Sequence, residues 1–96
     1  VMDVVKHIPV DEIMFFETSG RTHRIELHGK KERVDFIGSM QELEGRLGSQ
    51  FLRVHRAYLV NVGQIGELDL KRREILMKNG ERCLFSRSVK QKLLSL

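Results

Sequence analysis

The amino-acid sequence predicts a mainly β fold, built from small antiparallel sheets with one short internal helix and a short C-terminal helix. Short apolar runs dominate the chain, and turns rich in glycine and polar residues separate them. Helical spacing replaces this pattern in only two segments. Because the runs are short, the core is expected between packed small sheets. The 96 residues leave no room for two separate cores, so residues 1–96 are expected to form a single domain.

Extended runs account for most of the chain. They lie at residues 4–10, 13–16, 24–28, 33–37, 52–54, 58–60, 67–70, 74–78 and 81–85. The run at 13–16, Ile-Met-Phe-Phe, is typical of a strand buried on both faces. Residues 24–28 and 33–37 alternate polar and apolar side chains, which predicts a hairpin. Asn79-Gly80 predicts a second hairpin with positive φ at both central residues.

Two segments have the signals of helix starts. Ser39 and Glu42 have the spacing of a capping box, and Gly48 can end the helix that follows. Near the C-terminus, Ser86 or Ser88 could serve as the N-cap of a second short helix.

Several function classes are excluded or disfavoured by composition. No apolar run approaches the roughly 20 residues of a membrane span, and no signal peptide is recognisable. The chain does not begin with Met, and we expect it to be a fragment of a longer protein. Cys83 is the only cysteine, which excludes an internal disulfide and a cysteine-cluster metal site. We expect it to be a buried, inert thiol, and a cytoplasmic location fits this cysteine usage.

Catalytic motifs are missing as well. None of the four histidines, His7, His23, His28 and His55, has a second ligand at a zinc-like spacing. His23 and His28 are five residues apart on what looks like one strand, so they should face opposite sides. No nucleophile elbow or glycine-rich phosphate loop occurs. We therefore expect no enzyme activity, no cofactor and no metal.

The charge distribution indicates a face that could bind phosphates. Seventeen Lys and Arg against thirteen Asp and Glu leave a net charge of +4. Residues 82–96 hold four cations and no carboxylate, and residues 51–61 hold Arg53, His55 and Arg56, also without a carboxylate. Such asymmetry is typical of nucleic-acid binders, although ordinary solvated faces can have it too.

Three segments are candidates for binding. Residues 19–24 form a polar, basic loop, or simply a solubilising turn. Residues 53–58 place two arginines and a histidine between apolar runs. The plainer interpretation is a solvated Arg53 and a structural His55 bonded to a backbone carbonyl. Residues 86–90 combine hydroxyls, cations and a helix start, as in a phosphate site or an ordinary capped helix.

The same segments carry a resemblance to a known family. The relevant residues are 11–17, 22–24, 51–61 (FLRVHRAYLVN), 78–80 and 86–87. In this order they resemble the LytTR-type DNA-binding domain of bacterial response regulators, especially the accessory gene regulator and competence types. The resemblance covers essentially the whole chain, and the run at 51–61 is its most specific part.

This resemblance implies a fold, a function and partners. The family's fold is an elongated stack of small antiparallel β-sheets that places loops in successive major grooves of double-stranded DNA. The domain is the cytoplasmic C-terminal output half of a two-component transcription regulator. The resemblance therefore implies a receiver domain N-terminal to this domain, and promoter repeats as its DNA target. We expect the isolated domain to be a monomer that pairs on DNA, with no membrane contact.

The resemblance also assigns roles to residues of this chain. The base-contacting positions fall on His23, Arg56 and Arg87. Members of the accessory gene regulator type carry Asn at the position of Arg56, so the base read there should differ. Phosphate contacts are expected from Ser19, Arg21, Thr22, Arg24, Ser86, Ser88 and Lys90.

The residue chemistry fits these roles. A guanidinium can donate two hydrogen bonds to guanine O6 and N7 in the major groove, which suits Arg56 and Arg87.

The competing hypothesis is a basic protein-interaction module that binds an acidic partner. A small RNA-binding β domain is a weaker alternative, because exposed aromatic residues for stacking are lacking: Tyr58 and most Phe residues lie within apolar runs.

Overall fold

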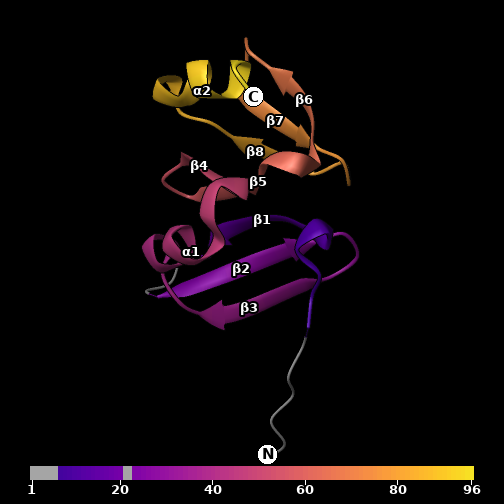
Figure 1. Ribbon diagram of the computed structural model, residues 1–96, viewed down its shortest axis with the longest axis vertical. Coiled ribbons are helices and arrows are strands. Elements are labelled where there is room, and N and C mark those ends of the chain that lie inside the picture. The colour runs from indigo at the N-terminus through magenta and orange to yellow at the C-terminus, as the bar shows by residue number, and fades with distance from the viewer. Residues whose placement is uncertain (1–6, 21–22) are drawn as a thin grey trace, which may run out of the picture.

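The computed structural model describes residues 7–20 and 23–96 and has eight β-strands in two antiparallel sheets (Figure 1). The strands are β1 (Ile13–Thr18), β2 (Arg24–Gly29), β3 (Arg33–Ile37), β4 (Phe51–His55), β5 (Tyr58–Asn61), β6 (Ile65–Asp69), β7 (Glu74–Met77) and β8 (Arg82–Leu84). The helices are α1 (Met40–Leu47) and α2 (Lys90–Leu94). Single 3-10 turns occur at η1 (Val10–Glu12), η2 (Gly48–Gln50), η3 (Val62–Gln64) and η4 (Arg87–Val89). The predicted mainly β architecture with two short helices is confirmed.

The two sheets are stacked along the long axis of the molecule. The five-stranded sheet has the order β3-β2-β1-β5-β4, and the three-stranded sheet has the order β6-β7-β8. Figure 1 shows β2, β3 and α1 toward one end, with the three-stranded sheet and α2 at the other. The principal extents of 48 × 25 × 22 Å make the molecule about twice as long as it is wide, as expected for an elongated stack.

Strand β1 is central because both of its faces are covered. Residues 13–16 are all buried, as the continuous apolar run predicted. On one face, Phe16 joins a core with Met40 of α1 and Phe51 of β4. On the other face, Phe15 joins the core that links the two sheets. That core contains Met14, Phe15, Val54, Val60, Ile75, Met77, Cys83, Phe85 and Leu93.

Asn61 fastens the start of β1 to the end of β5. Its side chain is fully buried, and its Nδ2 donates to the carbonyl oxygens of Val10 (3.0 Å) and Ile13 (2.9 Å). Its Oδ1 accepts from the Gly63 amide at 3.1 Å. One amide side chain therefore satisfies three backbone groups where the chain enters and leaves the five-stranded sheet.

The predicted capping box at Ser39 is present in modified form. The Ser39 hydroxyl accepts from the Glu42 amide (3.2 Å), and it donates to the Glu42 carboxylate (3.1 Å). Helix α1 ends at Gly48, whose φ of 71° is one that favours glycine.

Some local expectations were wrong. The extended run expected at residues 4–10 is not a strand over residues 7–10, where Val10 begins the turn η1, and its first three residues lie outside the described part of the chain. In the hairpin turn at Asn79-Gly80, only Gly80 has a positive φ, of 93°. Met77 and Glu81 are bonded across the turn, so the loop has three residues and only its last residue must be left-handed.

The C-terminal helix also starts differently from the prediction. Ser86 precedes the turn η4 and Ser88 lies within it, and the side chain of Ser86 makes no capping bond. Helix α2 then begins at Lys90 and has only five residues.

No helix among the described residues is long and apolar enough to span a membrane.

Candidate nucleic-acid interface

Two backbone hydrogen bonds hold the three predicted binding segments together. The Thr18 amide, at the end of β1, donates to the Ala57 carbonyl in the β4–β5 turn at 3.1 Å. The Ser86 amide donates to the Val54 carbonyl at the other side of that turn at 2.7 Å. The loop after β1, the β4–β5 turn and the start of η4 are therefore neighbours, although nearly seventy residues separate the first from the last.

The β4–β5 turn presents the exposed side chain of Arg56 and is braced by Arg53. The Arg53 guanidinium donates to the carbonyl oxygens of His55 (3.0 Å) and Arg56 (2.6 Å), and it also meets the Glu44 carboxylate of α1 at 3.2 Å. The expectation of a solvated Arg53 was therefore wrong. Its planar fork can satisfy two turn carbonyls at once, which fixes the backbone that carries Arg56.

His55 is structural, but its bonding differs from the prediction. Its Nδ1 accepts a hydrogen bond from the Ala57 amide at 3.1 Å, where a bond to a carbonyl was expected. The Nδ1 atom therefore lacks a proton, and the proton of the neutral ring is on Nε2. The ring also lies against Tyr58, with centroids 5.7 Å apart. His55 thus shapes the same turn as Arg53.

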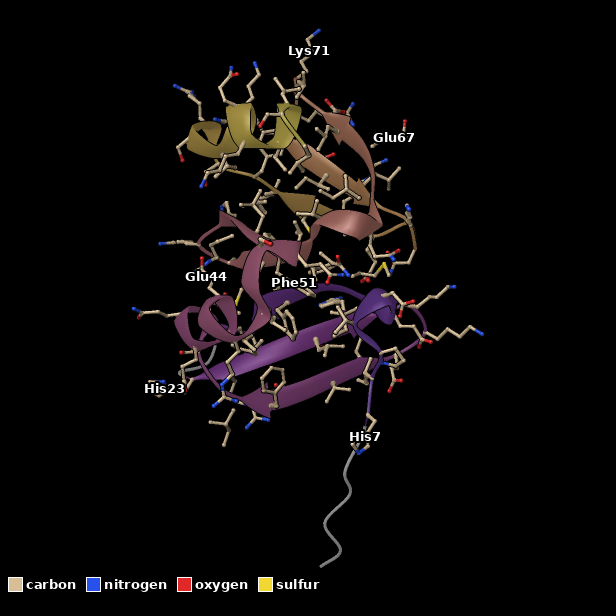
Figure 2. All side chains as sticks on the ribbon, in the orientation of Figure 1. His7, His23, Glu44, Phe51, Glu67 and Lys71 are labelled. Atoms are coloured by element: carbon tan, nitrogen blue, oxygen red, sulfur yellow. The ribbon has the colours of Figure 1, made fainter. Side chains whose placement is uncertain are left out.

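His23 lies in the turn before β2 and not on the strand itself. Its side chain is exposed and points away from the core (Figure 2), and its φ is 60°, in the left-handed region that non-glycine residues rarely adopt. Its carbonyl accepts from the Gly38 amide at 2.8 Å, which fixes the turn against the end of β3. The prediction that His23 and His28 lie on opposite faces of one strand was wrong, because only His28 belongs to β2.

The remaining candidates around this loop differ in how free they are. Arg24 donates through two nitrogens to one oxygen of Asp35, at 3.0 and 3.2 Å, so a carboxylate already offsets its charge. Ser19 is exposed, and its hydroxyl donates to the Arg24 carbonyl only at 3.4 Å. Arg21 and Thr22 lie outside the described residues.

The third segment presents Arg87 at the start of η4. Arg87 and Ser88 are exposed, while Ser86 and Lys90 are half-buried. Within the described part of the chain, the Arg87 side chain has no hydrogen bond or ion pair, and neither has that of Arg56. Both guanidiniums are therefore available to an external acceptor.

The β6–β7 turn adds cations that the sequence analysis did not single out. Arg72 and Arg73 line a shallow hollow together with His55, Ser86 and Arg87. A neighbouring hollow is lined by Leu70, Lys71, Arg73, Arg87 and Lys90. The sequence signal for these cations is the Lys-Arg-Arg run at 71–73. It was missed because the carboxylates of Asp69 and Glu74 on either side lower the local net charge.

The candidate DNA-binding residues, from His23 through Arg56 and Arg87 to Lys71, are together called the basic face and are spread along much of the molecule. Figure 2 shows His23 toward one end of the long axis and Lys71 at the other. The segments that carry Arg56 and Arg87 are linked by the bond between Ser86 and Val54. These are turns of different strands, and no helix of the described chain presents this set of cations.

Cys83 is not part of this face. It lies on β8 and is 1% exposed, and burial, together with the charges of Glu17 and Glu81, raises the pKa of its thiol. The expected buried, inert thiol agrees with this position.

Comparisons with known proteins agree over nearly the whole chain. The family model of the LytTr DNA-binding domain matches residues 3–96. The accessory gene regulator protein A of Staphylococcus epidermidis is 37% identical over 86 residues, covering 88% of this chain and 36% of that protein. Accessory gene regulator A of Staphylococcus aureus strain Mu50 is 38% identical over 87 residues, covering 90% of this chain and 36% of that protein.

The comparison with solved structures also finds a LytTr DNA-binding domain. The solved structure of a LytTr DNA-binding domain from Bacillus cereus superimposes with a TM-score of 0.78 at 28% sequence identity. The match covers 93% of this chain and 86% of that one. The chain thus spans about a third of the length of the regulators it matches and most of the solved domain.

Proposed function

The chain belongs to the LytTR DNA-binding domain family, and from this premise we propose that it binds double-stranded DNA sequence-specifically through its basic turns. The observation that carries the proposal is the pair of backbone bonds, Thr18–Ala57 and Ser86–Val54, that unites the three basic segments. Arg56 and Arg87 project from two of these segments, are exposed, and have no side-chain hydrogen bond or ion pair to residues 7–20 and 23–96.

Base reading is assigned to Arg56, Arg87 and His23. Each arginine can donate two parallel hydrogen bonds to guanine O6 and N7, which is the commonest specific contact in the major groove. His23 can donate to a purine N7 or accept from an exocyclic amine. The preference of each arginine for its base pair should be worth about 1–3 kcal/mol.

Phosphate contacts position the domain on the duplex. The candidates are Ser19, Arg21, Thr22, Arg24, Ser86, Ser88 and Lys90, to which the structure adds Lys71, Arg72 and Arg73. Such contacts supply affinity and register, but they carry no base information themselves. Arg24 can contribute least, because Asp35 already holds its guanidinium.

The length of the molecule suits more than one groove. Its long axis of 48 Å exceeds one turn of B-DNA, about 34–36 Å. A straight duplex curves away from a long, rigid face, so we expect modest bending toward the protein, most easily at a pyrimidine–purine step.

The wider context follows from the relatives. The chain corresponds to 36% of the accessory gene regulator proteins that it matches. We therefore propose that residues 1–96 are the non-enzymatic, cytoplasmic output domain of a longer bacterial response regulator with an N-terminal receiver domain. We also propose that the isolated domain is a monomer and pairs on repeated promoter sites.

A binding-site selection with randomised duplex DNA tests the proposal. The wild-type chain should enrich a defined site, and Arg56→Ala and Arg87→Ala should each lose preference at a different base pair. Arg82→Ala is a matched control, because Arg82 is exposed on β8 and its guanidinium meets the Glu74 carboxylate of the neighbouring strand at 3.4 Å. It should leave the selected site unchanged.

The salt dependence separates DNA binding from the protein-interaction alternative. The logarithm of the affinity should fall with the logarithm of salt by about 0.9 for each phosphate neutralised. We expect roughly four to seven such contacts per domain. If the affinity does not change with salt and no DNA sequence is selected, an acidic protein partner is favoured. If Arg56→Ala and Arg87→Ala weaken binding to all DNA sequences equally, these arginines contact phosphates and do not read bases.

A further inference from the structure

A second cluster of polar side chains lies on the other side of β1, outside the basic face. It contains Glu17 of β1, Glu26 and His28 of β2, and Glu81 from the β7–β8 turn. Glu26 and His28 are two residues apart on one strand, so they share a face. Glu17 is the direct cross-strand neighbour of Glu26. The cluster therefore sits where the two sheets meet.

His28 is the buried centre of this cluster. Its side chain is only 5% exposed, and its ring stacks on Phe15 with centroids 4.1 Å apart. Its Nδ1 lies 2.8 Å from a Glu81 carboxylate oxygen in a well-formed hydrogen bond. Since the carboxylate can only accept, Nδ1 carries the proton, and the ring orientation is fixed.

The opposite nitrogen of the ring has no such partner. The Nε2 atom lies 2.9 Å from a Glu26 oxygen and 3.0 Å from a Glu17 oxygen. Neither contact has the geometry of a hydrogen bond, and Nε2 is buried without a hydrogen-bond partner among residues 7–20 and 23–96. A buried nitrogen that faces two carboxylate oxygens without hydrogen bonds is costly unless something positive lies between them.

We propose that Glu17, Glu26 and His28 bind a divalent cation of the zinc class. The three ligand atoms lie within 4.8 Å of one another, with the nitrogen–oxygen separations near 3 Å. Ligand atoms around one tetrahedral zinc, with bonds of about 2.0–2.1 Å, lie about 3.3 Å apart. Outward shifts of a few tenths of an ångström by two partly exposed glutamates would open the site.

The donor set indicates the class of cation. One imidazole nitrogen with two carboxylate oxygens suits zinc and its transition-metal neighbours better than magnesium or calcium, which prefer oxygen donors alone. Glu17 and Glu26 keep side-chain exposures of 32% and 34%, so water can reach the remaining coordination position.

Glu81 supplies the support that metal-binding histidines usually have. A carboxylate that accepts from the distal ring N–H fixes the tautomer and raises the basicity of the ligating nitrogen. Glu81 is itself held by Asn79 at 2.7 Å and by Arg33 at 2.8 Å. Through this chain of contacts, a cation on β1 and β2 would also fasten the β7–β8 hairpin, and so stabilise the stack of the two sheets.

Calorimetric titration of the metal-stripped 96-residue chain with Zn²⁺ tests the proposal. We expect one ion per chain, a rise in the midpoint of thermal unfolding, and no comparable effect of equimolar Mg²⁺. Glu26→Gln removes a ligand from a partly exposed position without disturbing the buried ring, and it should weaken Zn²⁺ binding at least tenfold. Glu81→Gln should weaken it about 10–100-fold, as is usual for partners of ligating histidines.

Two control variants exclude incidental binding. Glu67→Gln removes an exposed carboxylate of β6 that does not belong to the cluster, and His23→Ala removes an exposed histidine outside it. Both should bind Zn²⁺ as the wild type does. The proposal is overturned if Zn²⁺ binding is absent, or if Glu26→Gln binds Zn²⁺ as tightly as the wild type. Ring nitrogen spectra that show His28 doubly protonated with Zn²⁺ present would equally overturn it, because a proton would then occupy the place of the cation.

Discussion

Arg53 offers the sharpest test of how the structure positions Arg56, the proposed base-reading side chain of the β4–β5 turn. In Arg53→Met the side chain keeps most of its apolar length but loses the donors to the His55 and Arg56 carbonyls and to Glu44. Hydrogen bonds from a charged group contribute about 1.5–3 kcal/mol each when well shielded. The Arg53 side chain is 31% exposed, so we expect a total loss of about 1–3 kcal/mol in the free energy of unfolding.

The assay combines stability with a panel of duplexes. In a domain of this size, 1 kcal/mol shifts the unfolding midpoint by about 4–8 °C. Affinities for duplexes with single base-pair changes should show lost discrimination at the base pair read by Arg56, while discrimination at the Arg87 base pair is kept. The physical reason is that Arg56 remains present but its backbone is no longer held.

Two matched variants separate positioning from charge. Arg53→Lys keeps the charge, but its single ammonium lacks the fork that reaches two carbonyls, so it should behave like Arg53→Met. Glu44→Gln removes only a surface ion pair and should cost less than about 1 kcal/mol. If Arg53→Lys restores binding, and Arg53→Met weakens all sequences alike with a lower salt slope, then Arg53 contacts phosphate and the reasoning is refuted.

Further predictions concern three other positions. His23→Gly should lose base discrimination. Its free energy of unfolding should stay unchanged or rise by up to about 1 kcal/mol, because glycine adopts the φ of 60° without strain. A clear loss of stability in urea unfolding would contradict this. Asn61→Leu removes three hydrogen bonds to the backbone, one buried and two partly buried, and should cost about 2–3 kcal/mol in the same assay. A cost below about 1 kcal/mol would contradict this. Cys83 should be labelled by thiol reagents only as fast as the protein unfolds. Since burial raises its pKa above the ordinary 9.0, the folded chain keeps a proton that the unfolded chain releases, and stability should fall as pH rises beyond 9. Cys83→Ala should make this fall smaller; the remainder includes Tyr58, whose pKa is also raised, mainly by burial.

Local patterns predicted most of the fold. The alternation at residues 24–28 and 33–37 predicted the β2–β3 hairpin, and Ser39 with Glu42 marked the start of α1. These signals work because period-two burial and helix capping depend on neighbours in the sequence. The Asn79-Gly80 pair identified a hairpin but not its loop length, since the same dipeptide fits both two- and three-residue loops, and the partner residues decide between them.

Long-range contacts were beyond the reach of the sequence. Arg53 was taken as solvated because its acceptors are turn carbonyls, which have no signature in the sequence. The left-handed φ of His23 could not be inferred either, since residues other than glycine rarely adopt it. The cluster around His28 joins side chains 53 residues apart in its bond to Glu81. Such a site depends on the stacking of the two sheets, which no local pattern encodes.

The internal partners of the arginines support the proposed division of their roles. Arg24, Arg33 and Arg82 each meet a carboxylate of a neighbouring strand or turn, so binding to an external anion would have to compete with a bond already made. Arg56 and Arg87 have no such bond within the described chain, and the turns that carry them are fixed by hydrogen bonds to their backbone. An unpaired guanidinium on a fixed backbone loses little freedom when it meets a guanine edge, because only its own rotamers remain to be ordered. A fold without a long exposed helix can therefore still read DNA, provided that its turns are held by the rest of the molecule and their side chains are left free.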